Sequence, residues 1–172
     1  MKPTEPEFSR LLPADRVPRE GSSETIAADA KELAALAKRL DVPALHSLSA
    51  ELKAEHWRGG GLKISGKFKV DLEQICVVTL DPFRDTIEGR VDRVYLPEAA
   101  AAETTEEDDT DHVVEGAADL GDLVTETLVL ALDPYPRKPG ASFGGAEFGV
   151  ESSPASFAGL AALKKPEPGP KA

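Results

Sequence analysis

The sequence predicts an α+β protein in which an antiparallel sheet, built from long hairpin strands around residues 46–96, packs with two helices at about 29–40 and 119–132. Three strand-like runs follow one another through the middle of the chain. Short turn signals separate them, which favours antiparallel neighbours. On either side of these runs, apolar residues recur at helical spacing.

The helix at 29–40 has a defined start and end. Asp29 followed by Glu32 is typical of a capping box, in which each side chain accepts a hydrogen bond from the other residue's backbone N–H. Pro43 stops the helix. Its apolar face consists of Leu33, Leu36, Ala37 and Leu40.

Two short strands are expected before this helix. Residues 8–17 predict an edge strand whose length Pro13 and Pro18 limit, because proline cannot donate to a sheet ladder. Its apolar residues are Phe8, Leu11, Leu12 and Val17. Glu24–Ala27 predicts the second short strand.

The long runs show the period of two that a half-buried strand requires. His46–Arg58 alternates apolar and polar residues, and Gly59–Gly61 then predicts a turn. From Leu62 to Val70 the alternation is cleanest, with one dry face and one face that carries Lys63, Lys67 and Lys69.

The second run continues through Leu72–Leu80, where the register becomes unclear. Either a bulge lies near Glu73–Gln74 or both faces of the strand are covered there. Asp81–Pro82 predicts the next turn, and a third strand then runs to Pro97. Its core positions are Phe83, Ile87, Val91 and Tyr95.

These elements predict a single domain over residues 1–135, with a disordered acidic insert at 98–116. Residues 136–172 are rich in proline and glycine and predict a tail. A short docking helix at 155–164 stays open as an alternative, because Phe157, Leu160 and Leu163 are three residues apart.

Charge is distributed unevenly along the chain. The formal net charge is −11, yet the stretch from Val94 to Pro136 has no Lys or Arg and carries twelve acidic residues. The rest of the chain is therefore close to neutral, and the acidic pI does not exclude a local surface for RNA. No apolar run reaches membrane-span length and the first residues do not resemble a secretory signal, so we expect a cytoplasmic protein that does not enter a membrane.

Nothing in the sequence predicts catalysis, a metal or a cofactor. Cys76 is the only cysteine, which excludes an intrachain disulfide and a multi-cysteine zinc site, and its apolar surroundings predict an inert buried thiol. The histidines are His46, His56 and His112, and none is close to Cys76 in the sequence. We therefore expect a non-enzymatic protein.

A lysine-rich hairpin is the first candidate contact surface. Lysines at every second residue lie on one sheet face at about 6–7 Å spacing, similar to the phosphate repeat of a nucleic acid, and an adjacent tryptophan can stack on a base. The RNA-contact candidates are Lys53, His56, Trp57, Arg58, Lys63, Lys67 and Lys69. A solvated face with edge-protecting lysines stays open as the alternative.

The acidic insert is the second candidate. Its carboxylates can attract a basic protein, such as a ribosomal protein, and the alternative is a solubilising linker. The partner-binding candidates are Glu106, Glu107, Asp108 and Asp109.

The segment Gln74–Phe83 resembles the central motif of the YceD family, the large ribosomal RNA subunit accumulation proteins, and Cys76, Leu80 and Pro82 are its family-motif positions. The order of the elements is also similar, including a helix that ends Leu128–Pro134 and the sequence Phe157–Leu163. Many members carry a second cysteine three residues after the first, where this chain has Thr79.

This resemblance implies a non-catalytic accessory factor in the synthesis, processing or stability of 23S ribosomal RNA and in large-subunit assembly. The implied partners are ribosomal RNA or a pre-ribosomal particle. A protein-binding adaptor that holds a basic ribosomal protein through the acidic loop is the alternative. The sequence makes no prediction about oligomeric state.

Overall fold

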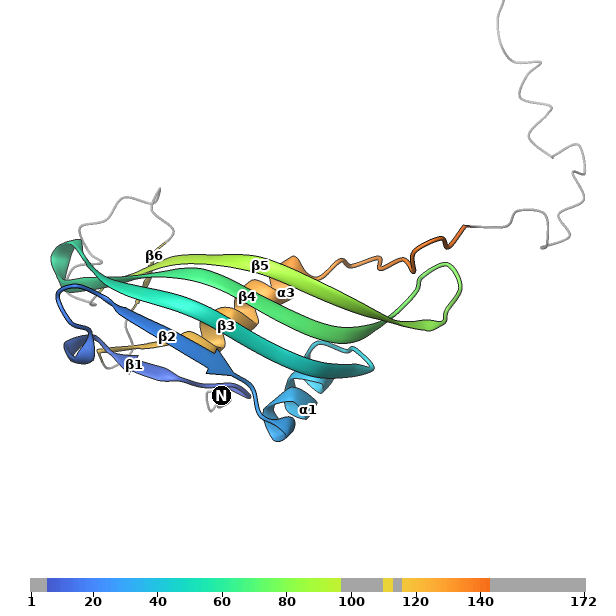
Figure 1. Ribbon diagram of the computed structural model, residues 1–172, viewed down its shortest axis with the longest axis horizontal. Helices are drawn as coiled ribbons and strands as arrows, with labels where there is room; N and C mark the ends of the chain where they lie inside the picture. The colour runs from blue at the N-terminus through green and yellow to red at the C-terminus, as the bar shows by residue number, and fades with distance from the viewer. Residues whose placement is uncertain (1–5, 97–109, 113–115, 143–172) are drawn as a thin grey trace, which may run out of the picture. The chain divides into compact units, whose positions relative to one another are not determined.

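Residues 6–96, 110–112 and 116–142 are described by the computed structural model of the chain (Figure 1). The described elements belong to one compact unit, residues 1–139; of a second unit, residues 140–172, only the first three residues are described. The architecture is α+β, as the sequence predicts.

A five-stranded sheet forms the main layer, in the order β2-β3-β4-β5-β6. Its strands are β2 (Ser22–Ala27), β3 (Ala44–Trp57), β4 (Gly61–Ile75), β5 (Pro82–Leu96) and β6 (Thr110–His112). Neighbours are antiparallel except for β6, which runs parallel to β5. A 3-10 turn, η2 (Arg58–Gly60), joins β3 to β4.

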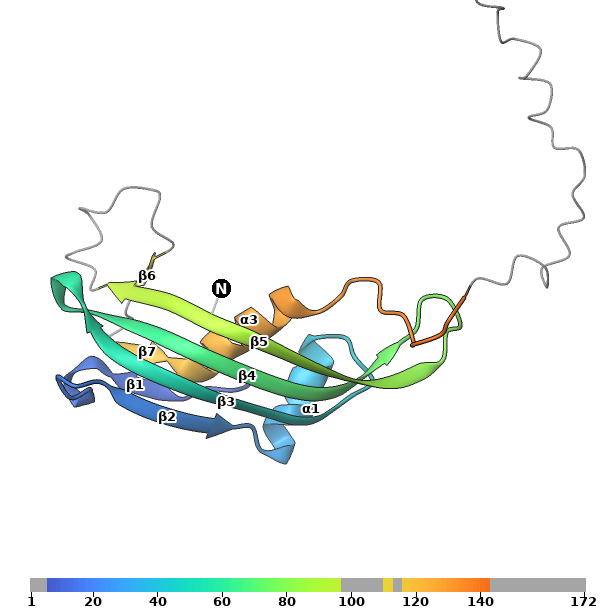
Figure 2. The same ribbon diagram turned by 45° about the horizontal axis from the view of Figure 1, so that its top comes forward.

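Both helices and a small two-stranded ribbon lie on one face of this sheet (Figure 1, Figure 2). The helices are α1 (Ala30–Arg39) and α3 (Leu120–Ala131), and the ribbon pairs β1 (Leu11–Pro13) with β7 (Ala117–Asp119). A short 3-10 turn, η1 (Ala14–Arg16), follows β1. We call the covered face of the sheet the inner face and the opposite one the outer face.

Local chemistry explains where the helices begin. Asp29 Oδ1 accepts hydrogen bonds from the N–H groups of Lys31 and Glu32 at 2.7 and 2.9 Å, and Glu32 Oε2 accepts from the Asp29 N–H at 2.8 Å. The predicted capping box is therefore confirmed. Asp119 caps α3 in a similar way, with Oδ1 accepting from the Gly121 and Asp122 N–H groups.

The core lies between the inner face and the helices, and the period of two predicted for β3 and β4 is confirmed. Leu48, Leu52, Ile64 and Val70 are buried, while the odd-numbered residues that alternate with them along each strand reach solvent to different degrees. The helices contribute Leu36, Leu120, Leu123, Val124 and Leu128.

The end of β4 differs from the prediction. The strand stops at Ile75 rather than continuing to Leu80, and residues 76–81 form the turn that was expected at Asp81–Pro82. The turn closes because the Cys76 N–H donates to the Asp81 carbonyl at 2.9 Å and Leu80 adopts a left-handed backbone conformation with a φ of 61°. Pro82 is already the first residue of β5.

Of the two alternatives left open near Glu73–Gln74, a bulge and coverage of both faces, the bulge does not occur there. The irregularity lies on the neighbouring strand, where the pairing shifts between Leu45 and Ser47 and leaves His46 as the extra residue. Inserting one residue in β3 lets Leu45 and Leu48 both point to the inner face. The pairing of β4 with β5 is continuous through Gln74.

The N-terminal strand is shorter than expected, and it lies in the two-stranded ribbon rather than in the main sheet. β1 covers only Leu11–Pro13 and pairs with β7, a strand that the sequence did not predict. β6 lies inside the stretch expected to be a disordered loop. The rest of that insert, residues 98–109 and 113–115, and the docking helix considered at 155–164 lie outside the described residues.

Candidate nucleic-acid interface

The β3–β4 hairpin carries the predicted lysines on the outer face of the sheet. In the pairing of β3 with β4, Glu51 lies opposite Lys67, Lys53 opposite Ser65, and Glu55 opposite Lys63. Directly opposite residues of an antiparallel pair share a face, so the candidate lysines of both strands lie together. We call Lys53, Lys63, Lys67 and Lys69 the lysine ladder.

Each lysine of the ladder has a carboxylate partner. The ion pairs, measured from Nζ to a carboxylate oxygen, are Lys53–Glu55 at 2.8 Å, Lys63–Asp92 at 3.3 Å, Lys67–Glu51 at 3.1 Å and Lys69–Glu88 at 2.7 Å. The outer face therefore carries positive and negative side chains side by side. The prediction of this surface used the lysines alone. The alternation that places Glu51 and Glu55 on the same face was the available signal for the partners of Lys67 and Lys53.

The Lys69–Glu88 pair shows how these groups stabilise each other's charge. The hydrogen bond between the two side chains raises the pKa of Lys69 and lowers the pKa of Glu88. Both groups are exposed, so salt screens the attraction and the pair contributes little to stability. An anionic ligand can therefore displace these carboxylates at small cost, although they remain nearby.

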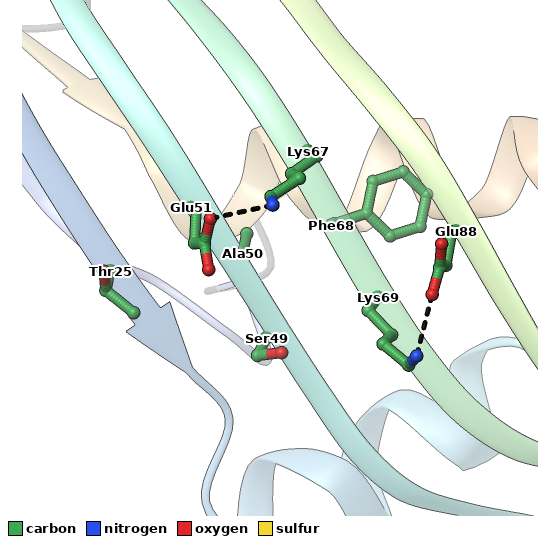
Figure 3. A pocket seen from close by; sticks show the side chains of 8 residues that line it. All are labelled: Thr25, Ser49, Ala50, Glu51, Lys67, Phe68, Lys69 and Glu88. Carbon is green, nitrogen blue, oxygen red and sulfur yellow. Dashed lines mark hydrogen bonds and ion pairs between the residues drawn. The ribbon is translucent and has the colours of Figure 1, made fainter.

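A shallow hollow of about 240 Å³ lies between two of these ion pairs (Figure 3). Lys67 and Glu51 join β4 to β3 on one side of it, and Lys69 and Glu88 join β4 to β5 on the other. Thr25 and Ser49 supply neutral polar side chains at its rim. The hollow can accept a small polar group, but its charges already compensate each other.

The closed end of the hairpin is different. Trp57 is 42% exposed, and the Nζ of Lys63 lies 5.5 Å from the centroid of its ring, which is within cation–π distance. Arg58 follows in η2 and is exposed. An aromatic ring and two cations are thus brought together at one end of the sheet. We call Trp57, Arg58 and Lys63 the hairpin end.

His56 does not belong to this group. Its position in β3 directs it to the inner face, where Nε2 lies 2.8 Å from the backbone carbonyl oxygen of Val17. Because a carbonyl oxygen only accepts, Nε2 carries the proton and donates. The residue therefore joins β3 to the segment that follows η1, and the structure separates it from the other RNA-contact candidates.

The turn after β4 holds the three family-motif positions. The Cys76 side chain is buried, Leu80 is exposed at the tip, and Pro82 begins β5. The Val77 N–H donates to the carbonyl of Pro136 at 2.9 Å, so the chain after α3 lies against this turn.

Several donors surround the Cys76 sulfur. The Thr79 hydroxyl has the largest effect, and with the backbone N–H groups of Lys138, Thr79 and Val78 it lowers the pKa of the thiol to about 7 against the opposing effect of burial. The thiol is buried, as predicted, but it is held in a polar environment that stabilises a thiolate. Thr79 stands at the position where many family members are expected to carry a second cysteine.

Comparison with protein families gives one match that includes this turn. The model of the family described as large ribosomal RNA subunit accumulation protein YceD matches residues 64–164, which is more than half of the chain. The chain belongs to the YceD family. The resemblance seen in the sequence is thereby confirmed.

The YceD match begins within β4 and continues through β5 and α3. It therefore includes the turn at Cys76 and two members of the lysine ladder, Lys67 and Lys69. The other two members, Lys53 and Lys63, precede the match, as do Trp57 and Arg58. Neither the curated proteins nor the solved structures gave a match.

Two features are absent from the described residues of this YceD protein. Within the described ranges, no group of three or more His, Cys, Asp or Glu side chains could hold a metal ion. No helix in the same part of the chain is long and apolar enough to cross a membrane. The partner-binding candidates Glu106, Glu107, Asp108 and Asp109 lie outside the described residues.

Proposed function

We propose that the protein is a non-catalytic accessory factor that promotes the accumulation of large-subunit ribosomal RNA in the cytoplasm, through the synthesis, processing or stability of 23S ribosomal RNA. Membership of the YceD family is the observation that carries this proposal. The partners would be ribosomal RNA or a pre-ribosomal particle.

The hairpin end is the best-supported place for contact with RNA. Trp57 exposes part of its ring, and stacking of a base on an aromatic side chain is worth about 1–3 kcal/mol. Arg58 has no ion-pair partner among the described residues, so its charge is available to a phosphate. The lysine ladder would contribute less, because each of its cations is matched by a carboxylate.

Filter binding to large-subunit RNA fragments tests this arrangement. We expect Trp57→Ala to weaken binding about tenfold, with Trp57→Phe as the matched control that keeps a ring. Arg58→Ala should reduce the salt slope by about one unit. Lys67→Ala with Lys69→Ala should have a smaller effect on both quantities.

Unchanged affinity and salt slope in Trp57→Ala, Arg58→Ala and a Lys63→Glu/Lys67→Glu/Lys69→Glu variant would overturn direct RNA contact by this hairpin. The same variants show by circular dichroism whether the fold is retained. The accessory role itself would then have to act through a protein.

Charge favours a second candidate function, an adaptor that holds a basic ribosomal protein. The outer face is compensated, whereas the sequence from Val94 to Pro136 carries twelve carboxylates and no Lys or Arg. Such an excess attracts a basic partner. Deletion of residues 103–111 should then weaken capture of a purified basic ribosomal protein, and the loss should become smaller as salt increases. Full retention of capture counts against the adaptor.

A further inference from the structure

In the part of the chain that the structure describes, the edge of β5 that faces away from β4 is open along most of its length; we call it the outer edge. β4 pairs with one edge of β5 from Pro82 to Tyr95, whereas β6 pairs with the other edge only at Val94–Leu96 (Figure 1, Figure 2). No described strand pairs with that second edge between Pro82 and Arg93. The unpaired N–H and C=O groups of such an edge can pair with another chain.

The register identifies the backbone groups that point outward. The Cys76 N–H donates to the Asp81 carbonyl, and hydrogen-bonded pairs alternate along an antiparallel ladder. Odd-numbered residues of β5 therefore exchange hydrogen bonds with β4, and even-numbered residues point theirs toward the open edge. In agreement, the Thr86 N–H is bonded by the Asp85 side chain at 2.8 Å rather than by β4.

The side chains of these even-numbered residues have a distinctive order of charges. Along the outer face, β5 presents Thr86, Glu88, Arg90 and Asp92. Arg90 lies opposite Lys67 in the register, a like charge, and no hydrogen bond or ion pair joins its side chain to another described residue. An acidic group on the open side of Arg90 would compensate it.

We propose that a second copy of this chain pairs antiparallel with the outer edge of β5 along Thr86–Asp92, about a two-fold axis at Gly89. In this register Glu88 lies opposite the partner's Arg90, and Arg90 lies opposite the partner's Glu88. Thr86 likewise lies opposite the partner's Asp92. The even-numbered residues then exchange backbone hydrogen bonds across the axis, and the two sheets become one.

Repulsion between like charges disfavours the two registers in which the axis is shifted by one residue. An axis moved to position 88 would place Glu88 opposite the partner's Glu88, and an axis moved to position 90 would place Arg90 opposite the partner's Arg90. Like charges directly opposite each other destabilise a strand pair. Gly89 at the axis adds no side chain between the two strands. β6 limits the pairing to residues before Val94.

The end of α3 supplies apolar surface beside the same edge. In both ribbon views α3 ends next to the outer edge of β5 (Figure 1, Figure 2). Val129 and Leu130, in its last turn, are 44% and 81% exposed. A strand added to β5 would lie over this turn and remove part of that apolar surface from water.

Charge exchange tests the proposal with the full chain in sedimentation-velocity experiments over a concentration series. The wild type should show a concentration-dependent dimer. Glu88→Arg and Arg90→Glu should each weaken it at least about tenfold, because each creates two like-charge contacts across the axis. The double variant Glu88→Arg/Arg90→Glu should dimerise again.

Mixing the two single variants gives the sharpest result. Equimolar Glu88→Arg and Arg90→Glu should form a heterodimer, because both contacts between positions 88 and 90 across the axis then join opposite charges. Glu51→Arg is the matched control, since it also removes an outer-face partner of a lysine but lies on an interior strand. A monomeric wild type, dimers insensitive to both reversals, or variants that stay monomeric on mixing would each overturn the proposal.

Discussion

Asp119 joins two segments that are far apart in the sequence, the residues before β1 and the start of α3. Its carboxylate caps α3, accepts from the backbone N–H of Arg10 at 2.7 Å and accepts from the Ser9 hydroxyl at 2.5 Å. The neighbouring Arg10 guanidinium also binds both carboxylate oxygens of Glu32 in α1, at 2.6 and 2.9 Å. A single acidic residue therefore fixes how the N-terminal strand meets α3.

Replacing Asp119 with alanine should destabilise the protein by about 1–2 kcal/mol, because the helix cap and the two contacts to Ser9 and Arg10, just before β1, are lost together. Urea denaturation followed by circular dichroism measures this change. Asp29→Ala is the matched control, since it removes an exposed cap that has no such contacts and should cost about 0.5–1 kcal/mol. An equal cost for both variants would contradict the joining role of Asp119.

Cys76 makes stability depend on pH. Its thiol pKa is about 7 in the folded state and is higher in the unfolded chain. At a pH between the folded and unfolded pKa values, the Cys76 thiol is more protonated in the unfolded state than in the folded state. The free energy of unfolding therefore rises with pH across roughly pH 7–9. The contribution is complete above the unfolded pKa and is lost as the pH falls through the folded pKa.

Thr79→Val should raise the thiol pKa and flatten this pH dependence, because the hydroxyl that lowers the pKa most is removed. Thiolate absorbance against pH, together with urea midpoints at two pH values, measures both effects. Thr127→Val, on α3, is the control for loss of a threonine hydroxyl. An unchanged thiol titration in Thr79→Val would contradict the assignment.

At the scale of the elements, two glycines let the strands approach their neighbours closely. A Cβ on Gly66 would overlap the backbone carbonyl oxygen of Glu51, whereas a Cβ on Gly89 would overlap the Phe68 ring. A backbone atom in an interior strand cannot move without disturbing the ladder, but an aromatic ring can turn.

Gly66→Ala should therefore destabilise the protein more than Gly89→Ala, with a cost of about 1–3 kcal/mol expected for the former. Thermal denaturation of both variants measures the order. Adding Phe68→Leu should recover part of the loss in Gly89→Ala and none in Gly66→Ala. The reverse order of stability would show that the close contacts are distributed differently.

These elements also show which parts of the fold can be predicted from the sequence. Periodicity predicted the buried face of β3 and β4, and the capping residues predicted α1, because both depend on nearby residues. The bulge at His46 and the strand β7 depend on pairing between distant segments, which periodicity does not contain. The Lys63–Asp92 and Lys69–Glu88 pairs need the register of β5 against β4, so the compensation of these lysines could not be read from the hairpin alone.

At the scale of the whole molecule, acidic residues outnumber basic ones, and the candidate cations for RNA contact lie on one hairpin. The chain has 31 acidic and 20 basic residues, and the cations of the lysine ladder are matched by carboxylates. This balance of charge does not favour general, sequence-independent binding of nucleic acid. RNA contact would be confined to the hairpin end, and self-association to the open edge of β5, so the two activities can be separated by mutation.

The central claim concerns the accumulation of large-subunit ribosomal RNA, and its most direct test is made in cells that naturally carry this protein. After deletion of its gene, the amount of 23S ribosomal RNA is measured relative to small-subunit ribosomal RNA. We predict that the ratio falls and that the wild-type chain supplied from a plasmid restores it. An unchanged ratio in the deleted cells would contradict the claim.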